Sequence, residues 1–172
     1  MIQDFLDLLK LFNQGKVRYL VVGGYAVGVH SEVRATKDLD IWVNPEIQNA
    51  RRVYRALMKF GAPLANLKPA DFTDRRSFYM MGIEPNRIDI IMALKGVNFN
   101  QCWKHRLRAR VEGIKVNFIS RAHLLRNKLM VGRTQDLADA EKLREAGLHD
   151  IKSQKKPLQA KKRLTRPPPP RG

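Results

Sequence analysis

The chain has 172 residues, of which 44% are apolar, which is enough for one domain with a hydrophobic core. It contains no apolar run long enough to cross a membrane, and its N-terminus carries acids where an export signal would carry bases. Its single cysteine, Cys102, excludes an internal disulfide and a zinc–thiolate cluster, so we predict a cytoplasmic protein without membrane contact.

Helices and strands are expected to alternate along the first 150 residues. In chain order the apolar periodicity and turn residues predict helix 2–12, strand 18–22, helix 25–29, strand 38–43, helix 46–60, hairpin strands 77–81 and 87–93, helix 98–105, strands 107–111 and 114–119, and helices 120–131 and 134–146. This order indicates a single α/β (α+β) domain over residues 1–150, with a mixed sheet flanked by helices and further helices at its C-terminal end. Residues 151–172 combine bases and prolines with few apolar groups and are predicted to form a disordered tail.

Positive charge dominates the composition. Lysine and arginine number 33 against 16 aspartate and glutamate residues, which gives a net charge of +17. Eight of the bases follow residue 150 with no acid among them, and the rest of the chain stays basic without them. Such a field favours a polyanionic partner, either nucleic acid or nucleotide phosphate. The alternative is that the charge serves solubility alone.

A glycine pair, Gly23-Gly24, directly follows the first predicted strand. Glycines at this place let the backbone approach a phosphate closely, with the start of a helix behind them. A tight structural turn explains the pair equally well. The sequence GGYAVG is not a dinucleotide-binding fingerprint, and the chain has no P-loop lysine motif.

Three aspartates stand in apolar frames that read as strands. Asp38 and Asp40 are two residues apart, so in a strand their carboxylates point to the same face. Asp89, in the segment RIDIIMA, lies on a probable neighbouring strand. Adjacent carboxylates repel each other unless a cation neutralises them, and Mg²⁺ is a common solution. A solvated pair of acids on an exposed sheet face is the alternative.

These motifs together resemble the polymerase-beta-type nucleotidyltransferase superfamily. The resemblance rests on GGYA, on RATKDLDIWV and on the distant DII, and covers about residues 15–146. It is closer to the short bacterial nucleotidyltransferases of the abortive-infection and toxin–antitoxin kind, which also carry a histidine, an R-x-T before the aspartate pair, and a late K…R…D…D segment. The matching residues here are His30, Arg34, Thr36, Lys128, Arg133, Asp136 and Asp139.

The resemblance implies a nucleotidyltransferase-like fold and transfer of a nucleoside monophosphate from an NTP to an acceptor, with release of pyrophosphate. It implies that Asp38, Asp40 and Asp89 bind Mg²⁺ or Mn²⁺ and act as catalytic residues, and that Asp89 also accepts the proton of the acceptor. Nucleotide contacts would come from Gly23, Gly24, Arg34, Thr36 and Lys128, and Lys128 would also be catalytic. The family's usual serine after the first glycine is replaced here by Gly24.

Each of these assignments has a structural alternative. Lys128 could equally be an exposed helix lysine, and Thr36 could bond its local backbone. His30 is better explained by packing or hydrogen bonding than by catalysis. Asp136 and Asp139 could simply favour the dipole of a helix start.

The net charge favours RNA, such as tRNA, as the acceptor. A basic cluster, consisting of Lys104, His105, Arg106, Arg108 and Arg110, could follow a nucleic-acid backbone, since its last three members share one face in a strand. By family analogy the protein could be a toxin with an antitoxin partner. The alternatives are nucleotidylation of a protein or small-molecule hydroxyl, or an inactive scaffold that binds nucleic acid or a partner protein.

Overall fold

The computed structural model describes residues 1–32, 36–83 and 86–154. Its helices are α1 (Gln3–Gln14), α2 (Gly23–His30), α3 (Ile47–Phe60), the 3₁₀ helix η1 (Pro69–Thr73), α4 (Phe99–Lys104), α5 (Arg121–Val131) and α6 (Thr134–Gln154). Its strands are β1 (Tyr19–Val21), β2 (Leu39–Val43), β3 (Phe78–Met81), β4 (Ile88–Ile91), β5 (Leu107–Val111) and β6 (Ile114–Phe118).

The described strands form one six-stranded mixed sheet in the order β3-β4-β2-β1-β6-β5. β1 runs antiparallel to β2 and parallel to β6, whereas β2 and β4 run parallel to each other. β3 and β4 form the predicted antiparallel hairpin pair, and β5 pairs with β6 in the same way. The predicted mixed α/β fold is confirmed.

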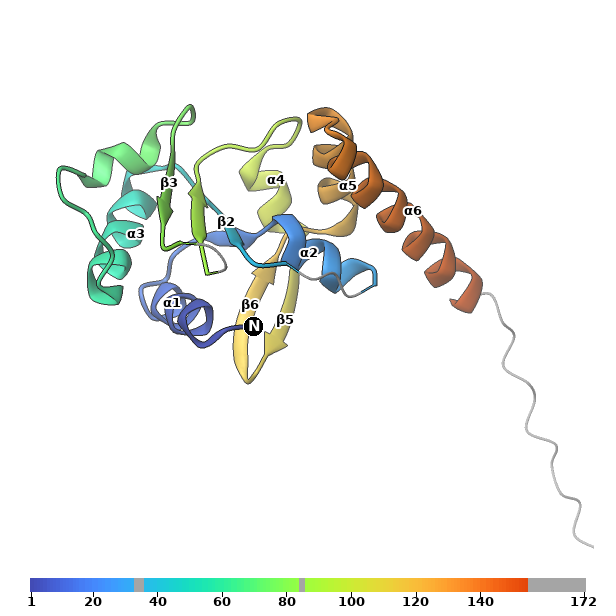
Figure 1. Ribbon diagram of the computed structural model, residues 1–172, viewed down its shortest axis with the longest axis horizontal. Helices are drawn as coiled ribbons and strands as arrows, with labels where there is room; N and C mark the ends of the chain where they lie inside the picture. Colours follow the sequence, from blue (N-terminus) through green and yellow to red (C-terminus); the bar gives the residue numbers. More distant parts are fainter. Residues whose placement is uncertain (33–35, 84–85, 155–172) are drawn as a thin grey trace, which may run out of the picture.

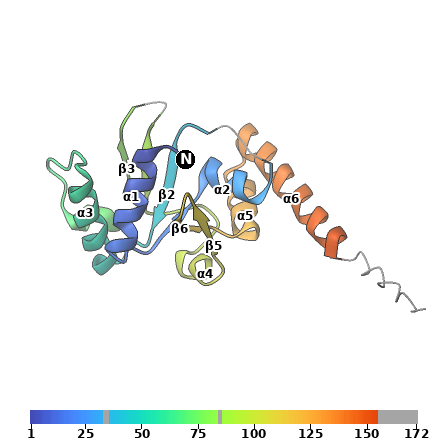
Figure 2. The same ribbon diagram turned by 90° about the horizontal axis from the view of Figure 1, so that it is seen from below.

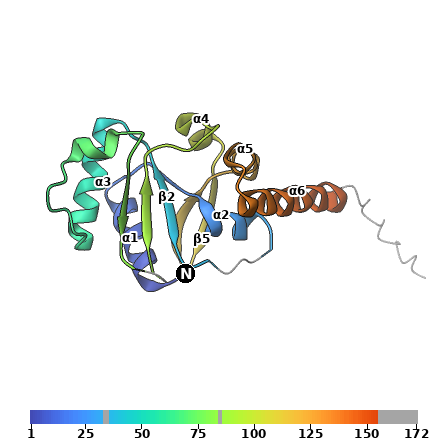
Figure 3. The same cartoon turned by 45° about the horizontal axis from the view of Figure 1, so that its top comes forward.

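Helices cover both faces of the sheet (Figures 1 and 3). α1 and α3 lie on one face, while α2, α4 and α5 lie on the other. α6 packs against α5 near its start and then extends away from the body (Figure 2). None of the helices in the described ranges is long and apolar enough to cross a membrane.

The hydrophobic core lies between the sheet and these helices. Alternation along β2 buries Leu39, Ile41 and Val43 against α1 and α3. On the opposite face Trp42 is also buried, with its ring edge-on to Phe99 of α4 at 5.0 Å between centroids. β2 is therefore apolar on both faces except at Asp40.

Helix boundaries agree with the sequence at α5 but not at α2 or α6. Ser120 caps α5 as expected, since its hydroxyl accepts from the backbone N–H of His123. α2 begins at Gly23 rather than at residue 25. α6 runs through Gly147, where we expected it to end, and continues to Gln154. Gly147 is not left-handed, so it does not act as a C-cap, and a Cβ there would make only an ordinary contact with the Arg121 guanidinium at 3.5 Å.

Candidate active site

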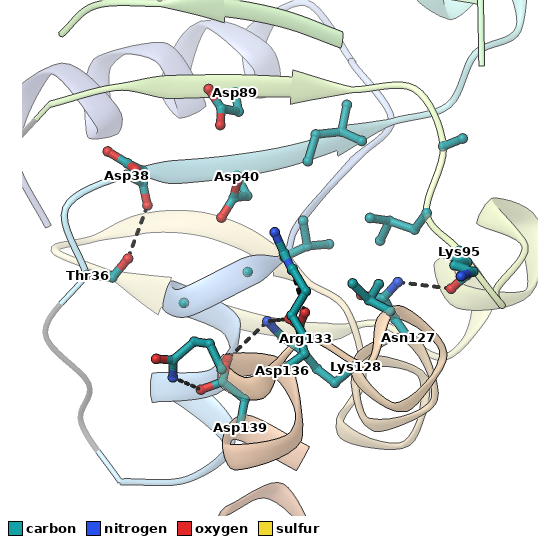
Figure 4. A pocket seen from close by; sticks show the side chains of 18 of the residues that line it. Thr36, Asp38, Asp40, Asp89, Lys95, Asn127, Lys128, Arg133, Asp136 and Asp139 are labelled. Carbon is teal, nitrogen blue, oxygen red and sulfur yellow. Dashed lines mark hydrogen bonds and ion pairs between the residues drawn. The ribbon is translucent and has the colours of Figure 1, made fainter. Parts of the chain in front are cut away.

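The three aspartates singled out in the sequence lie together on the face of the sheet that carries α2 and α5. Parallel pairing of β2 with β4 sets Asp40 directly opposite Asp89. Asp38 precedes β2 by one residue and shares the face of Asp40. All three side chains line one pocket of about 600 Å³. Figure 4 shows the three carboxylates side by side along the two strands. Three carboxylates from two neighbouring strands therefore open into a single hollow.

The negative charge in this row is incompletely neutralised. Burial, the charge of Asp89 and that of Asp38 raise the pKa of Asp40 to about 6, in spite of Lys128 and Arg87 nearby. Burial also raises the pKa of Asp89 above its ordinary value. Ionisation of these carboxylates therefore destabilises the folded protein, and a bound cation would offset that destabilisation.

One cation, Arg87, lies within the row and had no role in our reading of the sequence. Its guanidinium is 3.0 Å from Asp38 Oδ2 and 3.1 Å from Asp89 Oδ1. The contact with Asp89 has ion-pair distance without the alignment of a hydrogen bond. The available signal was the spacing, because Arg87 stands two residues before Asp89 and so shares its face.

The glycine pair fits around the aspartate strand. Gly23 has a φ of +59°, and a Cβ built on it would lie 1.9 Å from Asp40 Oδ2. A Cβ on Gly24 would lie 2.6 Å from Thr36 Oγ1. The two glycines thus let the start of α2 sit directly against the carboxylate strand, which gives them a structural reason independent of any phosphate. Both also line the pocket.

Lys128 lies on the opposite wall of the pocket, on α5, and is not an exposed helix lysine. Its Nζ donates to Asp136 Oδ1 at 2.9 Å and lies 3.0 Å from Asp139 Oδ2. The side chains of Asp136 and Asp139 are 3% and 0% exposed. The two aspartates that we considered as helix-dipole residues are instead the partners of a buried ammonium group that joins α5 to α6.

Arg133 extends from the turn between α5 and α6 into the same pocket. Its Nε donates to Asp136 Oδ2 at 2.7 Å, while 78% of its side chain remains exposed. Burial alone would raise the pKa of Asp136, but hydrogen bonds from Arg133 and Lys128 outweigh it and hold that pKa below its ordinary value. The sequence motif that contains Arg133 predicts no specific role for it. It is the pocket arginine with the most exposed side chain.

A divalent cation fits the donors of this pocket by their chemistry. Asp38 Oδ1 and Asp89 Oδ1 are buried oxygens that lack a hydrogen-bond partner in the described part of the chain. Carboxylate oxygens are the ligands that Mg²⁺ and Mn²⁺ prefer. Within the described ranges, however, no three His, Cys, Asp or Glu side chains form a ready-made metal cluster. The carboxylates are thus suited to a cation, with Arg87 between two of them.

Of the remaining predicted residues, Thr36 lines the pocket, His30 makes a structural hydrogen bond, and Arg34 is not described. The hydroxyl of Thr36 lines the pocket and donates to the Asp38 carbonyl at 3.3 Å, as its local-bonding alternative predicts. His30 bonds the Ile119 carbonyl through Nε2 at 2.6 Å, in keeping with a structural role. Arg34 lies outside the described residues, as does the tail beyond residue 154.

The basic cluster is divided between structural and exposed members. The Arg106 guanidinium lies 3.7 Å from the centroid of the Trp103 ring and donates to Asn117, so it is held within the fold. Arg108 and Arg110 on β5 are exposed and line a second hollow together with Lys115 of β6. This hollow, of about 470 Å³, has no acidic residue in its lining.

Comparison with known proteins places the fold. No family model matches the chain, and no curated protein matches it by sequence. Among solved structures, a nucleotidyltransferase from Thermotoga maritima described as putative superposes with a TM-score of 0.55 at 18% identity, covering 87% of this chain and 96% of its own. The lincosamide antibiotic adenylyltransferase LnuA superposes with a TM-score of 0.50 at 16% identity, covering 85% of this chain and 98% of its own. The antibiotic-resistance factor ANT(2'')-Ia gives 0.50 at 11% identity, over 88% and 92%.

Proposed function

We propose that this protein transfers a nucleoside monophosphate from an NTP to an acceptor hydroxyl with the help of Mg²⁺ or Mn²⁺. The observation that carries the proposal is the row of Asp38, Asp40 and Asp89, which opens into a pocket of a size usual for nucleotide-sized ligands. A fold shared with nucleotidyltransferases supports the same reaction class. The link to the toxin–antitoxin nucleotidyltransferases rests on sequence motifs, and the structural comparisons support the fold alone.

In this proposal the three aspartates hold the cation, which supplies positive charge to the reacting phosphate. Asp89, at the β3 side of the row, also accepts the proton of the acceptor hydroxyl, and its raised pKa suits a base. Gly23, Gly24 and the backbone N–H groups at the start of α2 contact the triphosphate.

The proposal assigns the phosphate contact to Arg133 and a structural role to Lys128. Lys128 already donates to two buried carboxylates, so we assign it the task of holding α5 and α6 in place. Arg133, which is exposed in the pocket, is assigned the contact with phosphate oxygens. Thr36 fixes the approach to β2, and a phosphate contact from Arg34 stays a prediction.

For the acceptor we propose RNA. The hollow lined by Arg108, Arg110 and Lys115, together with Asn13 of α1, carries positive charge and has no acid among its described lining residues, which suits a nucleic-acid backbone. A toxin role with a protein antitoxin would follow from such an activity, and growth arrest on expression, prevented by Asp40→Asn, would support it.

A small-molecule hydroxyl is the second candidate acceptor. Two of the superposed proteins are described by the antibiotics that they modify or resist, which supports this candidate as far as fold permits. Their identity to this chain is low, so the charge of the chain decides our order of preference. A protein hydroxyl or an inactive binding scaffold are further alternatives that the same experiment separates.

The test is incubation with each labelled NTP, Mg²⁺ or Mn²⁺, total RNA, cell protein and an added lincosamide antibiotic. We expect label in RNA with the wild type and none with Asp40→Asn, while Asp4→Asn, an exposed acid of α1, serves as the matched control. Label in RNA should fall steeply with added salt, and Arg108→Gln with Arg110→Gln should reduce that salt dependence. Label in protein or in an added antibiotic would replace RNA as the acceptor, and no label with any NTP would refute the transfer.

A further inference from the structure

Arg87 occupies the place between the carboxylates where a cation is expected. It stands one residue before β4, and its backbone carbonyl accepts from the N–H of Leu39, so its position is fixed by the sheet. Its guanidinium lies within 3.1 Å of oxygens of both Asp38 and Asp89. The side chains involved are 30%, 25% and 13% exposed, which makes this a largely shielded contact.

Two other cations of the pocket wall, Lys128 and Arg133, are paired with aspartates of α6, while Lys95 at the rim is exposed. Lys128 is 2.9 Å and 3.0 Å from its two aspartates on α6, and Arg133 donates to one of them. Arg87 is therefore the cation paired with Asp38 and Asp89, whereas the charge of Lys128 affects Asp40 more than that of Arg87 does. One guanidinium cannot balance three carboxylates, so the row keeps a net demand for cations.

We propose that Arg87 is an internal counter-ion that bridges Asp38 and Asp89 in the metal-free protein and competes with free divalent cations for these carboxylates. The inference rests on the proposed function, because it assigns the carboxylates to a cation. Arg87 is a positioning residue in this scheme, acting through the aspartates that it contacts.

A consequence concerns the order of binding. A free metal ion that binds Asp38 and Asp89 has to displace the Arg87 guanidinium, which then loses both of its ion pairs without a replacement. A metal–NTP complex brings phosphate oxygens that can receive the displaced guanidinium, so the exchange then conserves its charge pairing. The protein should therefore bind the metal weakly alone and strongly together with the nucleotide.

The experiment measures Mn²⁺ binding by electron paramagnetic resonance, with and without a non-hydrolysable ATP analogue. We expect Arg87→Gln to bind free Mn²⁺ at least about tenfold more tightly than the wild type, and to lose most of the enhancement by the analogue. Arg87→Lys, whose single ammonium cannot bridge both carboxylates as the fork does, should fall between them. Arg75 is exposed on the surface, so Arg75→Gln is the matched control and should bind Mn²⁺ with the affinity of the wild type.

Each outcome decides the matter. Equal or weaker binding of free Mn²⁺ by both Arg87 variants, in proteins that unfold with an unchanged cooperative transition, would overturn the counter-ion and leave the metal site standing. If Arg87→Gln does not fold, the Arg87→Lys comparison alone makes the decision. Absence of Mn²⁺ binding in every variant, with the nucleotide analogue present, would overturn both the counter-ion and the proposed function.

Discussion

Two groups of aspartates face each other across the pocket, and they differ in charge balance. On α5 and α6, Asp136 and Asp139 share Lys128, and Arg133 adds a second cation. In the row on and beside β2 and β4, Arg87 is paired with Asp38 and Asp89, and Asp40 has no ion pair among the described residues.

The pKa values follow this difference. The pKa of Asp136 is held below its ordinary value, whereas that of Asp40 is raised to about 6. The balanced group, Asp136 and Asp139 with their cations, stabilises the contact between α5 and α6. The unbalanced group of Asp38, Asp40 and Asp89 has excess negative charge, which favours the binding of a cation.

The largest effect is expected from removing the cation of the balanced group. Lys128→Met should lower the free energy of unfolding by about 3–5 kcal/mol, because Asp136 and Asp139 then remain buried without their shared ammonium. Urea unfolding measures the loss, and Lys142→Met, an exposed lysine of α6, is the control. A loss below about 1 kcal/mol would contradict a structural role for this group.

Neutralising Asp40, an acid of the unbalanced group, should raise the free energy of unfolding. The pKa of Asp40 is about 6 in the folded protein and 3.8 ordinarily, so the folded state binds more protons and loses stability as the pH rises from about 4 to about 6. In the presence of EDTA, Asp40→Asn should therefore raise the free energy of unfolding by up to about 3 kcal/mol at pH 7.

The same variant should show no such gain at pH 4, where the wild-type carboxyl is already largely protonated. Urea titrations at both pH values, with and without Mn²⁺, measure the difference. A stabilisation that is equal at both pH values would show that charge crowding is not its cause.

Gly23 sharpens the comparison because it depends on the same carboxylate. Gly23→Ala should destabilise the protein by about 2–3 kcal/mol, since it adds a collision with Asp40 to a left-handed backbone. Gly61→Ala, at a φ of +85° with open space around its Cβ, should cost only about 1 kcal/mol. Equal losses in thermal unfolding would mean that the Asp40 contact contributes nothing.

The smallest effect on stability should come from Arg133. Because its side chain is 78% exposed, Arg133→Gln should change the free energy of unfolding by less than about 1 kcal/mol. Nucleotide affinity should nevertheless fall by about fivefold to tenfold, as expected for a lost charged contact to phosphate. Fluorescent-nucleotide binding tests this, with Arg144→Gln on α6 as control, and an unchanged affinity would exclude the phosphate contact.

The sequence was sufficient for the positions of the carboxylates. Alternation and the apolar frames of Asp40 and Asp89 predicted strands with shared faces, and the pairing of β2 with β4 agrees. It was insufficient for their partners. The cation that meets Asp38 depends on which strand neighbours β2, and spacing along one strand does not contain that information.

Glycines and helix residues were misread for a related reason. A glycine after a helical pattern predicts an end, but α6 continues through Gly147 to Gln154 and packs against α5. The sequence left Lys128 open between a phosphate contact and an exposed helix lysine, because the aspartates that bury it come from the following helix. Both cases depend on tertiary contacts, which local propensity does not encode.

The parallel pairing of β2 with β4 also bears on how the molecule folds. β1 and β2 meet through a short stretch of chain, but β4 reaches β2 only after α3, η1 and β3 have been placed. The aspartate row therefore depends on a pairing between residues far apart in the sequence, and we predict that it forms late in folding. A cation that binds the assembled row should slow unfolding more than it speeds folding, because its ligands come together only on the native side of the barrier.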